Sequence, residues 1–328
     1  MTRSPMLSRT TWAFGVAALT LAAFAACGGP VPIAGSSGLT GPGQGTDTNL
    51  GLNTNPGTST STGGSTGTAA VWPPAGYTNV TPAAVGAYAL GPEITSSTVD
   101  PSTATTSGTA ASNCVAFLGV VRDFKMGNQP GGHPDFETAP VGLETGIVAN
   151  TLGTDDKPVY VTTARQPTAS TTGPDNFNQW YNNVSGVNMP YVVALQLQDV
   201  NGAASFQATV PKSSFFPLDG AGFGNEGEDH NFSFTTEIHT AFQYNGGENF
   251  TFSGDDDVWV FINKQLVIDL GGRHAQLDKT VPIDSLGLTK GNVYDLAVFH
   301  AERHTNQSNF RIDTTLSFTN CGEEIIGK

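Results

Sequence analysis

The sequence predicts an all-β fold, an antiparallel β-sandwich or closed barrel. In the chain, this domain follows a disordered N-terminal tether. Two observations predict the fold. From Asn113 onward, short runs of alternating apolar and polar residues, rich in β-branched and aromatic side chains, are separated by Gly, Asn and Pro turns. The chain also holds 40 glycines and only 13% charged residues, which is typical of an extracellular β protein with many turns. Helical periodicity is scarce, so we expect many short strands packed in layers.

The N-terminus has the pattern of an export signal. Arg3 and Arg9 give a basic start, and the apolar segment Trp12–Ala26 ends in small residues. That segment is too short to remain in a bilayer as a permanent helix. We therefore expect residues 1–26 to be a signal peptide.

The end of this segment, Phe24–Cys27, resembles a bacterial lipobox. The resemblance implies that Cys27 is lipidated and anchors the protein in a membrane. Gly28 does not resemble the Asp that retains some lipoproteins in the inner membrane, so we expect the outer membrane or cell surface. An ordinary secretory signal, with Cys27 as a free or paired thiol, is the alternative.

Composition then divides the rest of the chain. Residues 27–70 are rich in Gly, Ser, Thr, Asn and Pro, cannot bury enough apolar surface to fold, and should form a flexible linker. Residues 71–112 mix short apolar runs with Ser/Thr-rich stretches and are expected to be a partly ordered extension. Residues 113–322 form the predicted β domain, and 323–328 a short tail.

Two cysteines, Cys114 and Cys321, lie at the edges of the predicted β domain. An exported chain reaches an oxidising compartment, so we expect them to form a disulfide that joins the first and last strands. Two unpaired thiols are the alternative.

The alternating runs give the expected strands, and one short helix is expected at Phe177–Tyr181. The strands are Val115–Asp123, Val159–Thr163, Val192–Asp199, Ala204–Val210, Phe232–Gln243, Asn249–Ser253, Val258–Ile262, Leu266–Asp269, Val281–Asp284, Val293–His300 and Phe310–Thr319.

Charge and motifs exclude several functions. Acidic residues outnumber basic ones by 28 to 14 and the pI is about 4.6, so nucleic acid is not an expected partner. The sequence has no G-x-S-x-G motif, and its glycine-rich turns lack the ending of a phosphate loop. We therefore expect a protein that is not an enzyme.

Three consecutive aspartates, Asp255, Asp256 and Asp257, stand between two predicted strands. Carboxylates this close repel one another unless water or a cation offsets the repulsion, and a hard cation such as Ca²⁺ suits them. The spacing differs from that of an EF-hand, so further ligands must come from elsewhere in the chain. A solvated acidic turn is the alternative.

A second polar loop, His300–Asn309, lies between the last predicted strands. Its Glu302, Asn306 and Asn309 carry oxygens of the kind that complete a calcium shell.

The same loop has two other interpretations. If the preceding strand continued through it, His300, Glu302 and His304 would share one face, and these are ligand types that zinc accepts. A plain polar loop in which Arg303 pairs with an aspartate is the third interpretation.

Long stretches of the chain resemble the fibro-slime domain. They include GDDDVWVFINKQLVIDLGGRH, LGLTKGNVYDLAVFHAERHTNQSNFRID, VVRDFKMGNQPGGHPDFE and FNQWYNNVSGVNMP, and the resemblance covers about Cys114 to Phe318. Fibro-slime domains occur in extracellular and surface proteins of bacteria and slime moulds. They are related to the PA-fourteen domain, the β-sandwich module of anthrax protective antigen and of fungal adhesins.

This resemblance implies a site. In the adhesin relatives an adjacent pair of aspartates binds Ca²⁺, and the Ca²⁺ binds sugar hydroxyls. The equivalent pair here is Asp255–Asp256, followed by Asp257 where those relatives often have Gly, and the second loop corresponds to Glu302–Asn309. The further ligand-contact candidates are Asn263, His274, Arg303 and His304.

Together these features predict a lipid-anchored surface protein. Its expected role is Ca²⁺-dependent carbohydrate binding or adhesion, with a glycan or matrix polysaccharide as partner. Trp259 is either a platform for a sugar ring or a core residue. A structural matrix protein with a purely structural Ca²⁺, and a zinc-dependent or glycoside-processing enzyme, are the alternatives.

Overall fold

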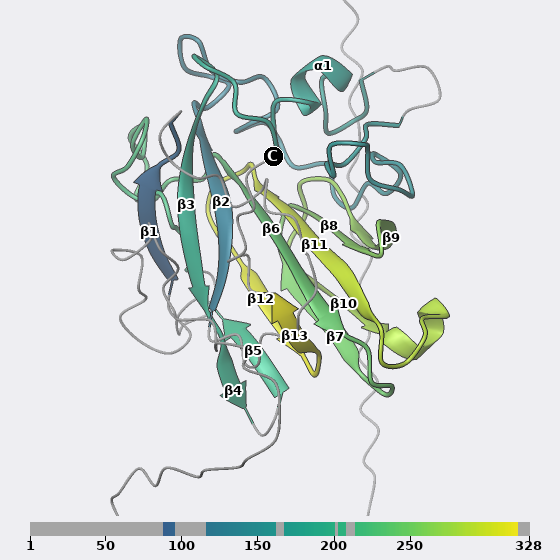
Figure 1. Ribbon diagram of the computed structural model, residues 1–328. Helices are drawn as coiled ribbons and strands as arrows, with labels where there is room; N and C mark the ends of the chain where they lie inside the picture. The colour runs from purple at the N-terminus through teal and green to yellow at the C-terminus, as the bar shows by residue number, and fades with distance from the viewer. Residues whose placement is uncertain (1–87, 96–115, 162–166, 201–202, 208–213, 321–328) are drawn as a thin grey trace, which may run out of the picture. The chain divides into compact units, whose positions relative to one another are not determined.

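Two antiparallel sheets and a four-residue helix make up the regular structure of the described residues, which confirms the predicted all-β class (Figure 1). The computed structural model describes residues 88–95, 116–161, 167–200, 203–207 and 214–320, all within one compact unit, Gly64–Lys328. No helix in these ranges is long and apolar enough to cross a bilayer. The expected signal peptide, lipidation at Cys27, linker, and the Cys114–Cys321 disulfide lie outside the described residues.

The larger sheet has eight strands. Its order is β1 (Tyr88–Glu93), β3 (Asn188–Gln196), β2 (Ala116–Phe124), β6 (Phe234–Gln243), β11 (Val293–Glu302), β8 (Asp257–Ile262) and β9 (Gln265–Leu270), and β13 (Ser317–Asn320) also pairs with β6. The smaller sheet has the order β10 (Leu277–Pro282), β7 (Asn249–Gly254), β12 (Phe310–Thr314), β5 (Ala203–Gln207) and β4 (Gln198–Val200).

The larger sheet is covered on both faces. One face packs against the smaller sheet, so that Phe252 and Val260 share a hydrophobic cluster. The other face carries a second cluster, in which Trp259 packs among rings from residues 125–187, which we call the covering segment. All six residues of β8 are therefore buried, as expected of a strand with no solvent face.

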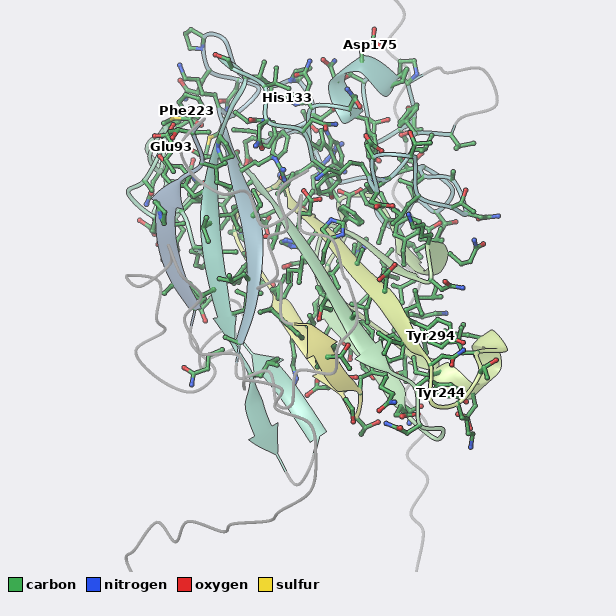
Figure 2. All side chains as sticks on the ribbon, viewed as in Figure 1. Glu93, His133, Asp175, Phe223, Tyr244 and Tyr294 are labelled. Carbon is green, nitrogen blue, oxygen red and sulfur yellow. The ribbon has the colours of Figure 1, made fainter. Side chains whose placement is uncertain are left out.

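The covering segment lies at one end of the larger sheet. Figure 2 shows His133 and Asp175 at that end, with Tyr244 and Tyr294 at the other end, near the turn between β6 and β7. The helix α1 (Pro174–Phe177) belongs to the covering segment and ends where the predicted helix was to begin. Proline fixes its first turn, a start signal that places the helix three residues earlier.

Some strands differ from the prediction. Val159–Thr163 is no strand in its described part, where Tyr160 makes only an isolated bridge to Val148. The expected strand Phe310–Thr319 is two strands, β12 in the smaller sheet and β13 in the larger. β10 begins at Leu277, and the expected strand Val281–Asp284 runs into a 3-10 turn, Ile283–Leu286. Alternation marks an extended chain but does not tell which sheet the chain joins.

Segment 71–112 contributes β1, which pairs with β3. The larger sheet thus extends into the part of the chain that was expected to be an N-terminal extension.

The three aspartates lie where the chain changes sheets. β7 belongs to the smaller sheet and β8 to the larger, so Asp255 and Asp256 form a crossing rather than a hairpin. The hairpin is the next one, β8 to β9, where Asn263 and Lys264 both have positive φ, 50° and 61°, as a type I′ turn requires. Asn263 therefore lies at the opposite end of β8 from the aspartates.

Candidate functional site

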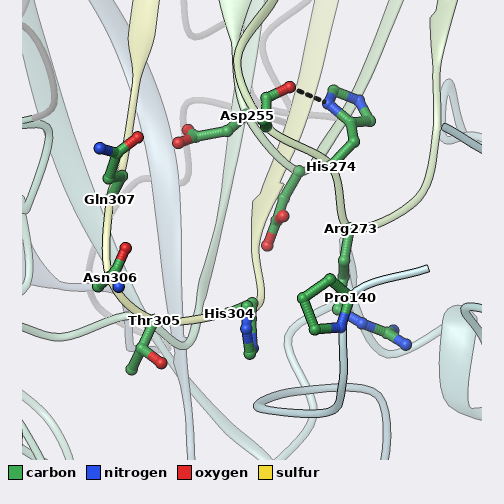
Figure 3. Close-up of a pocket in the computed structure, with 10 residues that line it drawn as sticks. Pro140, Asp255, Arg273, His274, His304, Thr305, Asn306 and Gln307 are labelled. Carbon is green, nitrogen blue, oxygen red and sulfur yellow. Dashed lines mark hydrogen bonds between the residues drawn. The ribbon is translucent and has the colours of Figure 1, made fainter. Parts of the chain in front are cut away.

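The sheet crossing and the loop after β11 meet at one pocket of about 160 Å³. Figure 3 shows Asn306 and Gln307 on one side of it, and His274 and Pro140 on the other. The lining residues are Pro140, Asp255, Asp256, Arg273, His274, Ala275, His304, Thr305, Asn306 and Gln307. Two polar loops that the sequence separates by some fifty residues are thus side by side.

Asp255 is held by the second loop. Its Oδ1 accepts a hydrogen bond from the Asn309 backbone N–H at 2.5 Å, and its Oδ2 accepts one from Asn309 Nδ2 at 2.6 Å. Burial nevertheless raises the pKa of Asp255, and the two bonds from Asn309 offset that rise only in part. Asn309, a predicted metal ligand, thus supports Asp255 and does not line the pocket.

Asp256 has a left-handed backbone, with φ 52°. Its N–H donates to the His274 carbonyl at 3.2 Å, and its Oδ2 accepts from the Arg303 backbone N–H at 2.8 Å. Burial raises its pKa well above the usual value, the Arg303 charge opposes that rise, and Asp257 and Asp255 add to it. Asp255 and Asp256 therefore present carboxyl groups to the pocket that a positive charge would stabilise in the ionised form.

Asp257, also predicted as a metal ligand, faces away from the pocket. It is the first residue of β8, and alternation places it on the same side as Trp259, toward the covering segment. Its Oδ1 accepts from the Gly272 N–H at 2.6 Å, and its Oδ2 accepts from Arg303 Nε at 2.6 Å. Its role in this structure is to hold Arg303.

Arg303, predicted to contact a ligand, is fully buried. Beyond Asp257, its Nη1 donates to the carbonyls of Asp135 at 3.0 Å and Ser170 at 2.8 Å. Its guanidinium carbon lies 4.4 Å from the centre of a Trp180 ring. The interpretation of a structural Arg303–Asp pair therefore matches the geometry, and Arg303 ties the covering segment to the crossing.

Glu302, the last residue of β11, directly precedes the loop that lines the pocket and is fully buried. Its Oε1 accepts the His304 N–H at 3.4 Å, and its Oε2 has no partner at hydrogen-bond geometry among the described residues. Burial raises the pKa of Glu302 well above its usual value, and Asp256 and Asp255 raise it further. An unpaired buried carboxyl oxygen beside two more carboxyl groups is where a cation would lower the free energy.

The zinc arrangement holds only in part. His300 and Glu302 do share the face of β11 that points between the sheets, but both are fully buried. His300 is surrounded by the rings of Phe215 and Phe310, and burial lowers its pKa to about 3. His304 follows the end of β11, lines the pocket and lies 3.4 Å from a Glu137 oxygen.

The described residues hold no group of three or more His, Cys, Asp or Glu side chains arranged to bind a metal. A cation in the pocket would have to draw on amide, hydroxyl and backbone oxygens as well, which suits Ca²⁺ better than zinc. Around the crossing, five buried carboxyl groups outnumber two buried guanidinium groups, so a cation of either kind would offset charge there. These groups are Asp135, Asp255, Asp256, Asp257 and Glu302 against Arg273 and Arg303.

Of the remaining residues predicted to contact a ligand, only one lines the pocket. His274 lines the pocket, and its Nδ1 lies 2.8 Å from the Ala275 carbonyl. Trp259 is fully buried and donates to Asp269, so it is a core residue rather than a sugar platform. Asn263 is at the far turn of β8.

Sequence reasoning missed Glu137 and Pro140. Both come from the covering segment, and Glu137 accepts hydrogen bonds from Thr305 of the pocket loop. No spacing in the sequence relates these residues to the aspartates.

Residues 219–327 match the PA14 domain family. The chain is 38% identical to protein psiQ of Dictyostelium discoideum over 212 residues, which is 60% of this chain and 21% of psiQ. It is 42% identical to protein psiD of the same organism over 198 residues, 56% of this chain and 38% of psiD. The match thus spans between a fifth and two fifths of the length of these relatives.

Two solved structures are weakly similar. One, described as the PA14 sugar-binding domain from an RTX adhesin, is 10% identical, with a TM-score of 0.29 over 64% of this chain and 99% of that one. The other, the PA14 domain of the MpAFP antifreeze protein, is 12% identical, with a TM-score of 0.24 over 66% and 93%. Scores of this size add nothing to the assignment, which rests on the family match and the sheets. The chain carries a PA14 domain and is homologous to the psi proteins of Dictyostelium discoideum.

Proposed function

We propose that the pocket binds a carbohydrate through Ca²⁺, and that the protein is a binding or adhesion module rather than an enzyme. One observation carries the proposal. The carboxyl groups of Asp255 and Asp256 line a pocket, their pKa values are raised by burial, and an oxygen-rich loop closes over them. A divalent cation would offset the free-energy cost of burying the two carboxylates in ionised form, and Ca²⁺ takes carboxylate, amide and backbone oxygens as ligands.

Different residues of the pocket would bind the cation and the sugar. Asp255 and Asp256 would hold the cation, and its charge would favour ionisation of the buried Glu302 near them. A bound Ca²⁺ keeps open coordination positions that neighbouring sugar hydroxyls can fill. Asn306 and Gln307 are exposed at the rim, where their amides can donate to and accept from a sugar.

The PA14 match is compatible with this role, since the PA14 domain of one RTX adhesin is described as sugar-binding. The fibro-slime resemblance supports it as well. The expected export signal and the resemblance of Phe24–Cys27 to a lipobox support a lipid-anchored place at the outer membrane or cell surface. Mass spectrometry of the mature protein tests the anchor: an acylated N-terminal cysteine is expected, and it should disappear in Cys27→Ser.

The central test is a calcium titration by calorimetry, with the Asp255→Asn and Asp256→Asn variants. Wild type should bind Ca²⁺ near one per chain, and each variant should lose at least tenfold in affinity, because one ion–ligand contact is lost. Asp278→Asn, at an exposed position of β10, is the matched control and should bind as wild type. Stoichiometric Zn²⁺ without Ca²⁺ in metal analysis of the purified protein would refute the proposal.

Glycan binding is tested on an array, with and without chelator. Binding that chelator abolishes, with the glycans recovered intact, is the expected result. Binding that persists in chelator and in Asp256→Asn would refute a Ca²⁺-dependent site.

A structural Ca²⁺ is the second candidate, and the size of the pocket favours it. A volume of about 160 Å³ is below the range of roughly 300–1,000 Å³ in which small-molecule pockets fall. Under this candidate, chelator lowers the melting temperature and no glycan binds at any calcium concentration.

A further inference from the structure

We propose that Glu137 is a positioning residue of this pocket, which holds the loop after β11 in the shape that cation and ligand binding need. The inference rests on the proposed function and deepens it, because it assigns control of the pocket to a segment outside the PA14 match. Glu137 is 168 positions from Thr305, and the PA14 match covers residues 219–327 only.

The Glu137 carboxylate accepts two hydrogen bonds from one residue of the loop after β11, Thr305. The Thr305 N–H donates to Oε2 at 3.0 Å, and the Thr305 hydroxyl donates to Oε1 at 3.1 Å. His304 Nδ1 lies 3.4 Å from the same Oε1. Both His304 and Thr305 line the pocket (Figure 3), so the carboxylate fixes one residue of the pocket wall, Thr305, and lies next to a second.

The Glu137 backbone adds a further contact. Its N–H donates to the Arg303 carbonyl at 2.7 Å, while the Arg303 N–H donates to Asp256 Oδ2. Arg303 is therefore held on both sides of its main chain, by Asp256 from the crossing and by Glu137 from the covering segment. The pocket loop begins at the residue that these two contacts fix.

The two residues that hold the Arg303 main chain both have a left-handed backbone, with φ 52° at Glu137 and 52° at Asp256. That region is uncommon for a residue with a β-carbon, and aspartate adopts it more readily than glutamate does. Only six described residues other than glycine have positive φ, and two of them form hydrogen bonds with the Arg303 main chain. The left-handed backbone of Glu137 is therefore found at the contact with Arg303, the residue from which the loop after β11 begins.

The test separates the carboxylate from the backbone. Glu137→Gly removes the side chain at a position where glycine adopts the observed φ without strain, so the fold should survive. Glu137→Gln keeps one acceptor oxygen for Thr305. Glu226→Gly is the matched control, because Glu226 is also a left-handed glutamate, φ 51°, whose carboxylate accepts one backbone N–H, from Met126, away from the pocket.

Hydrogen–deuterium exchange without Ca²⁺ gives the first readout. Peptides covering residues 303–309 should exchange faster in Glu137→Gly by tenfold or more, because the charge-assisted bond to Thr305 is lost. Glu137→Gln should fall between Glu137→Gly and wild type. Wild-type exchange in Glu137→Gly, or equal acceleration in Glu226→Gly, would overturn the inference.

Calcium titration gives the second readout, one that a purely structural role would leave unchanged. Glu137→Gly should weaken Ca²⁺ binding about tenfold and reduce the rise in melting temperature that Ca²⁺ causes, with Glu137→Gln recovering part of both. Wild-type calcium affinity in Glu137→Gly, despite fast exchange, would also overturn the inference. If the wild type itself binds no Ca²⁺, the proposed function fails, while the exchange data still decide whether Glu137 holds the loop.

Discussion

Arg303 and Asp257 form an ion pair in which neither side chain is exposed to solvent. The same arginine donates its backbone N–H to Asp256, the neighbouring aspartate. One arginine is therefore bound through its side chain by one aspartate and through its main chain by the next. The three aspartates thus have two different roles. Asp255 and Asp256 line the pocket, and Asp257 binds the side chain of Arg303.

Arg303→Met should destabilise the protein by about 3–5 kcal/mol, because it leaves the Asp257 carboxylate buried without its partner. Urea denaturation measures the loss. Lys264→Ala breaks an exposed ion pair with Asp156 and should cost less than about 1 kcal/mol. A loss below about 1 kcal/mol in Arg303→Met would mean that the buried pair is not needed.

Gly272→Ala should destabilise the protein by more than the cost of its conformation alone. Gly272 has φ 97°, and a Cβ there would meet the Gly142 carbonyl oxygen at 2.4 Å. Its N–H also donates to Asp257, so displacing it disturbs the anchor of Arg303. Gly287→Ala is the matched control, with φ 69° and open space around it, and should cost only about 1 kcal/mol. Equal melting temperatures for the two variants would contradict this prediction.

Asp123 should make the protein less stable as pH rises toward neutrality. Burial raises its pKa to about 7, although Asn231 and the Phe223 N–H donate to it. The folded protein therefore holds this proton more tightly than the unfolded chain does. The stability it contributes is present below the unfolded pKa near 4 and is lost as pH rises through about 7.

Asp123→Asn should remove that slope. Urea denaturation at several pH values between 4 and 8 measures it, and the difference between wild type and variant isolates the one group. Asp278→Asn at the exposed β10 position should keep the wild-type slope. Parallel stability curves for wild type and Asp123→Asn would disprove the assignment.

Glu237, in contrast to Asp123, should make the protein more stable as pH rises. It is fully buried, which raises its pKa, but Lys157 and Arg122 outweigh burial and hold the pKa well below its usual value. Its contribution to stability is present above the unfolded pKa of about 4.5 and is lost as pH falls toward the folded one. Glu237→Gln should cost about 3–5 kcal/mol at pH 7, less below pH 4.

Chemical denaturation at pH 7 and pH 3 measures this change. Glu228→Gln, an exposed glutamate, is the control and should leave stability within about 0.5 kcal/mol at both values. A loss in Glu237→Gln that is as large at pH 3 as at pH 7 would show that packing rather than charge is responsible.

Much of the fold could be predicted from local patterns. Alternation marked the strands that became β2, β6, β8 and β11, because a period of two follows from the strand itself. It could not show that Phe310–Thr319 divides between two sheets, because sheet membership depends on distant partners. Val159–Thr163 failed for a related reason: Val159 and Val161 are exposed, and the described part of the segment forms only one bridge, from Tyr160 to Val148.

The candidate site, too, could be predicted only as far as it depends on local residue type and order. The sequence by itself determined that carboxylates gather at Asp255–Asp257, that an oxygen-rich loop follows β11, and that Arg303 is available to pair with an aspartate. These are properties of residue type and order. Only the tertiary structure decided that Asp256 faces the pocket while Asp257 faces the interior, because β8 alternates between two covered faces. Only the tertiary structure brought in Glu137, because its contact with Thr305 spans 168 positions and no local pattern encodes it.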